Sequence, residues 1–241
     1  MAVKKSLWVG TTVLAALMPA VPRVDGQSQA DPTKPQLRAG VSVQMPATTS
    51  AVAVREADNI DSFVLAVTAR GTVYLGITPV TPADLPEKLK ADASIRAGKK
   101  VYLKSDARTA YAVVERVLDA MRSAGVSAPV LLTDQRDGSD TRMPLPPKGI
   151  EVRVGPSLPA DSAAVVVHVS GSGQPSPTLT VAGEQVTAAN LQATLRQRLQ
   201  NLADKVVVVK GDAQTPFGEV VRAIDACRAL GATVLLVTPG V

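Results

Sequence analysis

The strongest constraint in this sequence is an internal repeat at an offset of 106 residues. Residues 72–125 align with residues 178–231 without a gap. In the stretch 101–125 against 207–231, eleven of twenty-five positions are identical, where unrelated segments would share about two. The repeat predicts two copies of one small domain within the 241 residues, instead of one large fold.

Composition changes divide the chain around this repeat. Residues 134–148 (DQRDGSDTRMPLPPK) are polar and then proline-rich, which indicates a linker. We therefore expect a first domain over residues 39–133 and a second over residues 149–241. The polar, proline-containing segment 27–38 is predicted to be a tether ahead of the first domain.

Each copy shows the same order of expected elements, β-β-α-β-α-β. Two extended runs around a turn are followed by a helix, a strand, a second helix and a closing strand. In both copies the pattern predicts an α+β domain with two helices on one face of a small mixed sheet. For the first copy the predicted ranges are 63–68, 72–75, a helix opening at Thr81, 101–103, a helix ending at Gly125, and 129–132.

The second copy is predicted to repeat these elements, and each copy has one additional candidate strand. The expected ranges in the second copy are 164–169, 178–181, a helix at about 188–202, 206–209, a helix at 216–230, and 234–237. Gly40–Met45 and Gly149–Val154 alternate apolar and polar residues, which suggests an edge strand ahead of each copy.

Composition excludes several classes of function. Aromatic residues make up only 2% of the chain and the net charge is +5, which argues against nucleic-acid binding. One cysteine and one histidine leave no basis for a disulfide, a multi-cysteine metal site or most zinc sites. A phosphate-binding Gly-Lys-Ser/Thr loop and a Gly-x-Ser-x-Gly elbow are both missing. We therefore expect a protein that is not an enzyme and has no catalytic, cofactor or metal residues.

The N-terminal segment, residues 1–26, is typical of an export or anchoring signal. Lys4 and Lys5 precede an uncharged run, Leu7–Met18, which Pro19 and Pro22 interrupt. The run suits a cleaved signal peptide, and the alternative is an uncleaved membrane anchor over Val3–Val21. Either interpretation places the rest of the chain outside the cytoplasm, in the periplasm or attached to the inner membrane.

The two repeats resemble the soluble domain of the ExbD/TolR family of biopolymer transport proteins. The resemblance is carried by VYLKSDARTAYAVVERVLDAMRSAGVSAPVLLT and by KVVVVKGDAQTPFGEVVRAIDACRALGATVLLVT. Each segment has a strand, an Asp, a helix that opens near an aromatic residue, a second Asp late in the helix, a glycine and a closing apolar strand. It covers residues 40–133 and, more loosely, 149–239.

The resemblance implies a membrane component of a transport system, with two departures: the soluble domain is in tandem instead of single, and the membrane Asp is missing. Family members lie in the inner membrane beside a proton-driven, multi-span partner of the ExbB/TolQ kind, and their single span carries an Asp that takes part in coupling. Leu7–Met18 contains no acidic residue, and the nearest echo, Pro22–Asp25, lies at the wrong end of the segment. The coupling role is therefore not transferred to this chain.

Four aspartates are candidate partner contacts, each with a structural alternative. Asp106 and Asp212 follow a strand and precede a helix, so an Asx turn or a helix cap is the structural interpretation. Asp119 and Asp225 are each flanked by arginines three residues away, a spacing typical of solvated ion pairs on a helix surface. Beside these, Cys227 is expected in the core.

His168 is expected on the solvent face of a strand. The runs 63–68 and 234–237 are interpreted as exposed sheet edges that could receive another strand.

The sequence thus predicts a noncatalytic, ExbD/TolR-like transport component, with self-association or pairing of its two domains within one chain. The alternative is a periplasmic interaction or scaffold module, which binds a partner protein or the cell wall and has no role in energy coupling.

Overall fold

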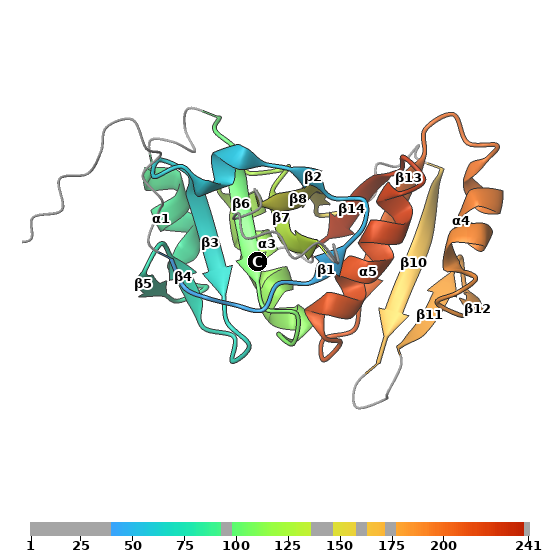
Figure 1. The fold of residues 1–241 in the computed structure, drawn as a ribbon, viewed down its shortest axis with the longest axis horizontal. Helices are drawn as coiled ribbons and strands as arrows, with labels where there is room; N and C mark the ends of the chain where they lie inside the picture. The colour runs from blue at the N-terminus through green and yellow to red at the C-terminus, as the bar shows by residue number, and fades with distance from the viewer. Residues whose placement is uncertain (1–39, 93–97, 136–146, 158–162, 172–176, 239–241) are drawn as a thin grey trace, which may run out of the picture. The chain divides into compact units, whose positions relative to one another are not determined.

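The computed structural model describes residues 40–92, 98–135, 147–157, 163–171 and 177–238. The predicted signal segment 1–26 and the tether 27–38 lie outside these ranges, as does most of the predicted linker. Pro35–Val241 form one compact unit that contains both repeats. Figure 1 shows the elements of this unit, and the ranges below follow its labels.

The first repeat has the expected order of elements, with short additions. Its core elements are β3 (Phe63–Val67), β4 (Val73–Leu75), β5 (Thr78–Val80), α1 (Leu85–Ala91), β6 (Val101–Ser105), α3 (Tyr111–Ser123) and β7 (Val130–Gln135). Two short strands and a 3-10 helix precede them, namely β1 (Ala47–Thr48), β2 (Val52–Ala53) and η1 (Arg55–Asp58).

The second repeat follows the same plan. It contains β10 (Ala164–Ser170), β11 (Thr178–Val181), β12 (Glu184–Val186), α4 (Leu191–Leu199), β13 (Val206–Gly211), α5 (Phe217–Arg228) and β14 (Thr233–Val237). Between the repeats lie β8 (Lys148–Glu151) and β9 (Arg153–Gly155). The predicted α+β class and the two helices per copy are confirmed, although α4 is shorter than the predicted helix at 188–202.

The long helices form where the apolar spacing predicts them, but the first helix begins later than expected. In α3, Tyr111, Val114 and Leu118 recur at helical spacing and all are buried against the sheet. Thr81 does not cap the α-helix. Its hydroxyl and its carbonyl both accept a hydrogen bond from the N–H of Asp84, which forms a separate turn before the helix. The α-helix itself starts one residue beyond that turn, at Leu85.

Each repeat builds its own sheet, so the two halves do not merge into one. The first sheet has the order β2-β8-β7-β6-β3-β4-β5, with β1 beside β7, and the second has the order β12-β11-β10-β13-β14-β9. The runs 63–68 and 234–237 are therefore wrongly predicted as edges. Strand β3 lies between β4 and β6, and β14 lies between β13 and β9, so their backbone groups are already paired.

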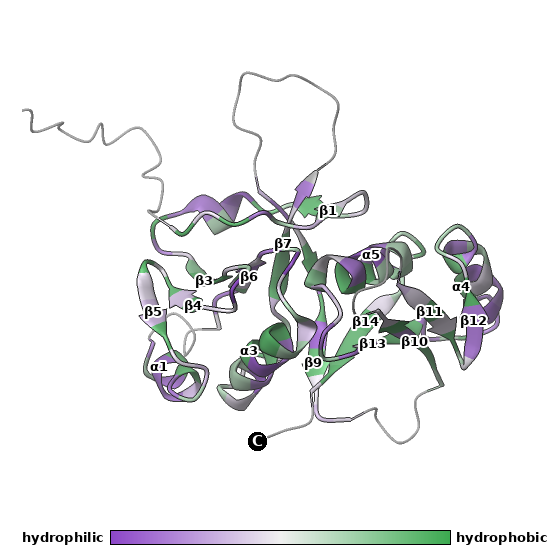
Figure 2. Cartoon of the chain, turned by 90° about the horizontal axis from the view of Figure 1, so that it is seen from below, coloured by the Kyte–Doolittle hydropathy of each residue, from purple (hydrophilic) through white to green (hydrophobic). Residues whose placement is uncertain are grey.

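The first sheet is covered on both faces. Helices α1 and α3 pack on one face with the main apolar core. The segment 45–62, which we call the strap, covers the other face, where Val54 and Ala57 pack on Tyr102, Val130 and Leu132. Figure 2 shows the strap and the two helices on opposite sides of β3 and β6.

The two additional edge strands are not placed as the alternation predicted. Residues 40–46 form no strand, and the short strand β1 follows them instead. Gly149–Val154 is divided between the two sheets, because β8 pairs with β7 while β9 pairs with β14. Val152 is the single residue between them, and it is buried. The chain thus passes from one sheet to the other within two peptide bonds.

Candidate functional site at the interface between the repeats

The start of α3 and the start of α5 are joined by backbone hydrogen bonds that repeat at the same offset of 106. Tyr111 N–H donates to the carbonyl of Thr215 at 2.8 Å, and Phe217 N–H donates to the carbonyl of Thr109 at 2.8 Å. A second pair follows, Ala112 N–H to Ala213 O at 3.0 Å and Gly218 N–H to Ala107 O at 2.8 Å. Each bond has a partner in which the two repeats exchange roles, as in a two-fold dimer.

These bonds satisfy donors that a helix cannot satisfy by itself. The first N–H groups of an α-helix have no partner within the helix. Neither α3 nor α5 has a side-chain cap. The loop of the other repeat takes that place, so each repeat completes the other.

The backbones approach closely at two glycines. A Cβ atom on Gly211 would lie 2.9 Å from Cδ1 of Tyr111 in the other repeat, and a Cβ atom on Gly218 would lie 3.1 Å from Cβ of Ala107. Such distances are shorter than ordinary contacts between carbon atoms. Only glycine fits these two positions without a shift of the neighbouring repeat.

Asp119 lies at this interface and is not solvated, contrary to the expected surface ion pair. Its carboxylate accepts hydrogen bonds from Arg122 at 2.6 Å and from the hydroxyl of Thr238, in the other repeat, at 2.8 Å. The expected pair with Arg122 is confirmed, whereas the expected exposure is wrong because Asp119 is 3% exposed. Arg116 donates instead to the carbonyl of Ala112.

Asp225 occupies the corresponding position on α5 and holds the strap. It accepts bonds from Thr49 N–H at 2.9 Å and from Ser50 N–H at 2.8 Å, and from both hydroxyls. The expected pairs with Arg222 and Arg228 are not formed, because these arginines bind Glu219 and the carbonyl of Ala232. Burial raises the pKa of Asp225, but the bonds from Ser50 and Thr49 outweigh it and lower the pKa.

Asp106 makes the Asx turn that its position predicts. Its carboxylate accepts the N–H of Arg108 at 3.0 Å and two bonds from the Arg108 guanidinium, each 2.9 Å long. It also accepts the N–H of Gln44. The Arg108 side chain and these N–H groups, against the effect of burial, lower the pKa of Asp106 to about 2.

Asp212, which corresponds to Asp106 in the second repeat, has a different partner. It lies at the surface, where its carboxylate is 2.8 Å from Nε2 of His168. The predicted solvent exposure of His168 is confirmed, since the side chain is 42% exposed. Cys227 is fully buried as expected, and desolvation raises the pKa of its thiol to about 12.

Sequence reasoning missed the side chains that reach across the interface. Thr238, directly after β14, donates to Asp119 across the interface, and Thr133, within β7, bonds the hydroxyl of the strap residue Thr48 at 2.7 Å. The strap residues Thr49 and Ser50 carry no motif of their own. Among the described residues, no group of three or more His, Cys, Asp and Glu side chains gathers as metal ligands would. The side chains described above bond the two repeats and the strap to one another.

A comparison with protein families matches the biopolymer transport protein ExbD/TolR family twice, over residues 31–136 and 138–239. The chain belongs to the ExbD/TolR family. Searches of curated proteins and of solved structures found no significant match.

ExbD/TolR proteins are components of biopolymer transport, and the family consists of accessory proteins that are not enzymes. Its members are anchored in the inner membrane and typically act with proteins of the ExbB/TolQ type. Within the described ranges, no helix has the length and apolar character that crossing a bilayer requires. The predicted anchor in residues 1–26 lies outside those ranges.

Proposed function

We propose that this chain is a noncatalytic periplasmic component of a transport complex, in which its two repeats take the place of two single-domain subunits. The observation that carries the proposal is the reciprocal pairing at Tyr111–Thr215 and Phe217–Thr109. A pair of separate subunits would make each such bond twice by symmetry, and this chain makes both within one molecule.

The energetics support a permanent pair. A hydrogen bond within a protein contributes about 0.5–1.5 kcal/mol relative to water, and four N–H groups at the two helix starts depend on the opposite repeat. The buried bond between Asp119 and Thr238 adds a charged contact across the same surface. Separation of the repeats would expose all of these groups at once, so the pair is expected to persist.

The expected place of the chain is the inner membrane, with both repeats in the periplasm. Lys4 and Lys5 would stay on the cytoplasmic side, and the segment that follows them would span the membrane or be cleaved. A partner of the ExbB/TolQ type, with several membrane spans, would supply the motor.

A second function is a periplasmic scaffold that binds a partner protein or the cell wall without energy coupling. The observation that favours it is the absence of any acidic residue in Leu7–Met18. Proton-driven coupling needs an ionisable group within the membrane, and such groups are normally retained there for function.

Purification of the tagged full-length chain from native membranes separates the two functions. Recovery of an ExbB/TolQ-type protein at a fixed ratio, resistant to a salt wash, is expected for the transport component. Its absence, with the chain intact, would favour the scaffold. Mass measurement of the mature chain on the same sample reports whether residues 1–26 are cleaved.

The pairing within one chain has its own test, which does not involve the membrane partner. Light scattering of the soluble part, residues 39–241, is expected to give the mass of one chain at micromolar concentration. A stable two-chain species would show that the repeats pair between molecules.

A further inference from the structure

Three surface cavities lie in series and cross from the first repeat to the second. The first, of 530 Å³, is lined by residues around Tyr102, and it shares Lys99 and Lys100 with a second cavity of 510 Å³. The second shares Ser127, Ala128 and Glu151 with a third cavity of 960 Å³. The three cavities are therefore neighbours along the surface, and together we call them the cross-repeat groove.

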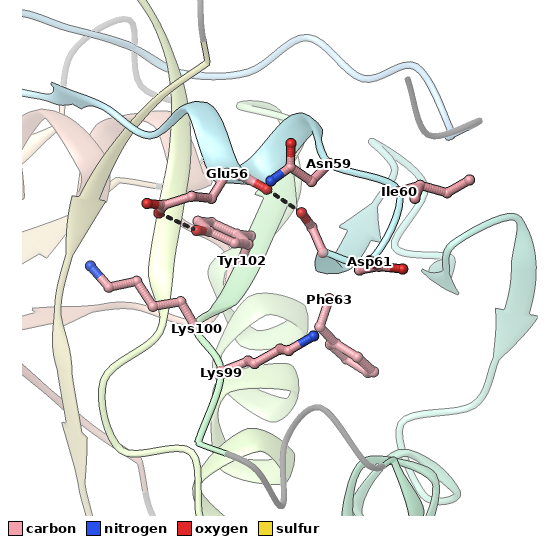
Figure 3. A pocket seen from close by; sticks show the side chains of 9 residues that line it. Glu56, Asn59, Ile60, Asp61, Phe63, Lys99, Lys100 and Tyr102 are labelled. Carbon is pink, nitrogen blue, oxygen red and sulfur yellow. Dashed lines mark hydrogen bonds between the residues drawn. The ribbon is translucent and has the colours of Figure 1, made fainter. Parts of the chain in front are cut away.

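The groove is apolar at the end in the first repeat. Ile60, Phe63 and Tyr102 line the first cavity, and Ile60 is 53% exposed. Figure 3 shows these side chains around the cavity, with Tyr102 tied to Glu56 by a hydrogen bond of 3.4 Å. An exposed apolar side chain beside an open cavity is a feature of binding sites for one large apolar group.

The remainder of the groove is basic. The second and third cavities contain five basic residues and two acidic ones, and all seven are exposed: Lys90, Lys99, Lys100, Arg153 and Lys205 against Glu151 and Asp204. In the described part of the chain, Lys90 and Lys100 form ion pairs, with Glu87 and Glu151 respectively. With the described residues, Lys99, Arg153 and Lys205 form no ion pair, so these three cations are available to an anionic ligand.

The order of these features identifies the kind of ligand. We propose that the cross-repeat groove binds an extended acidic segment of a partner protein, with one large apolar side chain in the cavity at Ile60, Phe63 and Tyr102. Carboxylates farther along the segment lie over Lys99, Arg153 and Lys205. A polypeptide supplies both chemistries on one strand, whereas a carboxylated glycan offers charge without a large apolar side chain.

Charge also sets the orientation of the segment. Glu56 and Asp61 line the apolar cavity, whereas Lys99 and Lys100 lie where it meets the second cavity, so a carboxylate is favoured on the side of the lysines. The groove is separate from the bonds that pair the repeats, so the proposal stands whether or not the chain associates with a motor protein. Only the paired form has the groove, since the third cavity is lined by residues of both repeats.

The test is a selection of displayed random twelve-residue peptides on the soluble part of the chain, residues 39–241. The selected peptides are expected to carry an acidic run and one large apolar residue. Their Kd should rise about tenfold or more in a charge-reversal variant that combines Lys99→Glu, Arg153→Glu and Lys205→Glu. A matched control reverses three exposed cations outside the groove, Lys88→Glu, Arg196→Glu and Lys210→Glu, and should leave the Kd within twofold.

A second variant isolates the apolar end. Ile60→Ser removes an exposed side chain, so folding is retained, and binding should weaken about three- to tenfold without a change in salt dependence. Selected peptides without acidic bias, or equal binding by the groove and control reversals, would overturn the proposal. Soluble peptidoglycan strands are the competing ligand. If they displace the peptides, and if the charge-reversal variant loses glycan binding as strongly as peptide binding, the groove binds a glycan and the proposal is overturned.

Discussion

Replacement of Gly211 by alanine tests the packing between the repeats. The added Cβ would lie 2.8 Å from Cγ2 of Val220 and 2.9 Å from Cδ1 of Tyr111. Carbon atoms normally approach to about 3.5 Å, so Tyr111 must move by about 0.6 Å, and this side chain is fully buried at the start of α3. Overpacking of this kind costs about 1–3 kcal/mol, and the lost flexibility of glycine returns about 0.5–1 kcal/mol.

We therefore expect Gly211→Ala to lower the free energy of unfolding by about 1–2 kcal/mol, and the melting temperature by about 2–8 °C for a chain of this size. Urea unfolding followed by circular dichroism measures the change. Gly155→Ala is the matched control, because its Cβ would meet only ordinary contacts at 3.5 Å.

A double-mutant cycle locates the contact. In a Tyr111→Leu background, the cost of Gly211→Ala should fall by about 0.5–1 kcal/mol, since the ring that it meets is gone. Equal stability of Gly211→Ala and Gly155→Ala, or no coupling with Tyr111, would refute the reasoning that the two repeats pack through this glycine.

Three further predictions concern single side chains. Asp225→Asn should destabilise the chain by about 1–3 kcal/mol and release the strap to proteolysis, whereas Asp212→Asn at the surface should do neither; an intact strap in Asp225→Asn would contradict this. The stabilisation from Asp106 should be complete above pH 4 and lost as the pH falls through 2, because its pKa is lowered to about 2, and Asp106→Asn should flatten that part of the profile of stability against pH. Cys227 should react with a disulfide reagent only after unfolding in urea, since its thiol is buried with a pKa raised to about 12; rapid labelling of the folded chain would contradict the burial.

The repeat made most of the fold predictable. Identities at an offset of 106 carry over to the structure as paired hydrogen bonds, and the apolar spacing of α3 gives its buried face directly. The closing Gly125 has φ +91°, as expected of a residue that ends a helix in the left-handed region. The buried face of α3 and the turn at Gly125 depend on neighbours within a few residues, which a single sequence records.

Features that depend on the partner of each surface were not predictable. Asp119 looks like a solvated helix residue from its arginine neighbours, yet it is buried where Thr238 of the other repeat bonds its carboxylate. The run 63–68 has the same composition whether it is an edge strand or a central one, and it is central because β6 pairs with the side that the hairpin strand β4 leaves open. The boundary between the domains, at 134–148, remains a prediction, although β7 extends to Gln135 and β8 begins at Lys148.

The covalent link between the two repeats removes a restriction that identical subunits cannot escape. In a homodimer any substitution appears on both sides of the axis, so every surface feature occurs in duplicate. Here the corresponding positions already differ: Asp106 binds Arg108 in one half, and Asp212 faces His168 in the other. A chain of this design can devote each half to a different neighbour, and so give direction to an assembly that symmetry would otherwise leave without one.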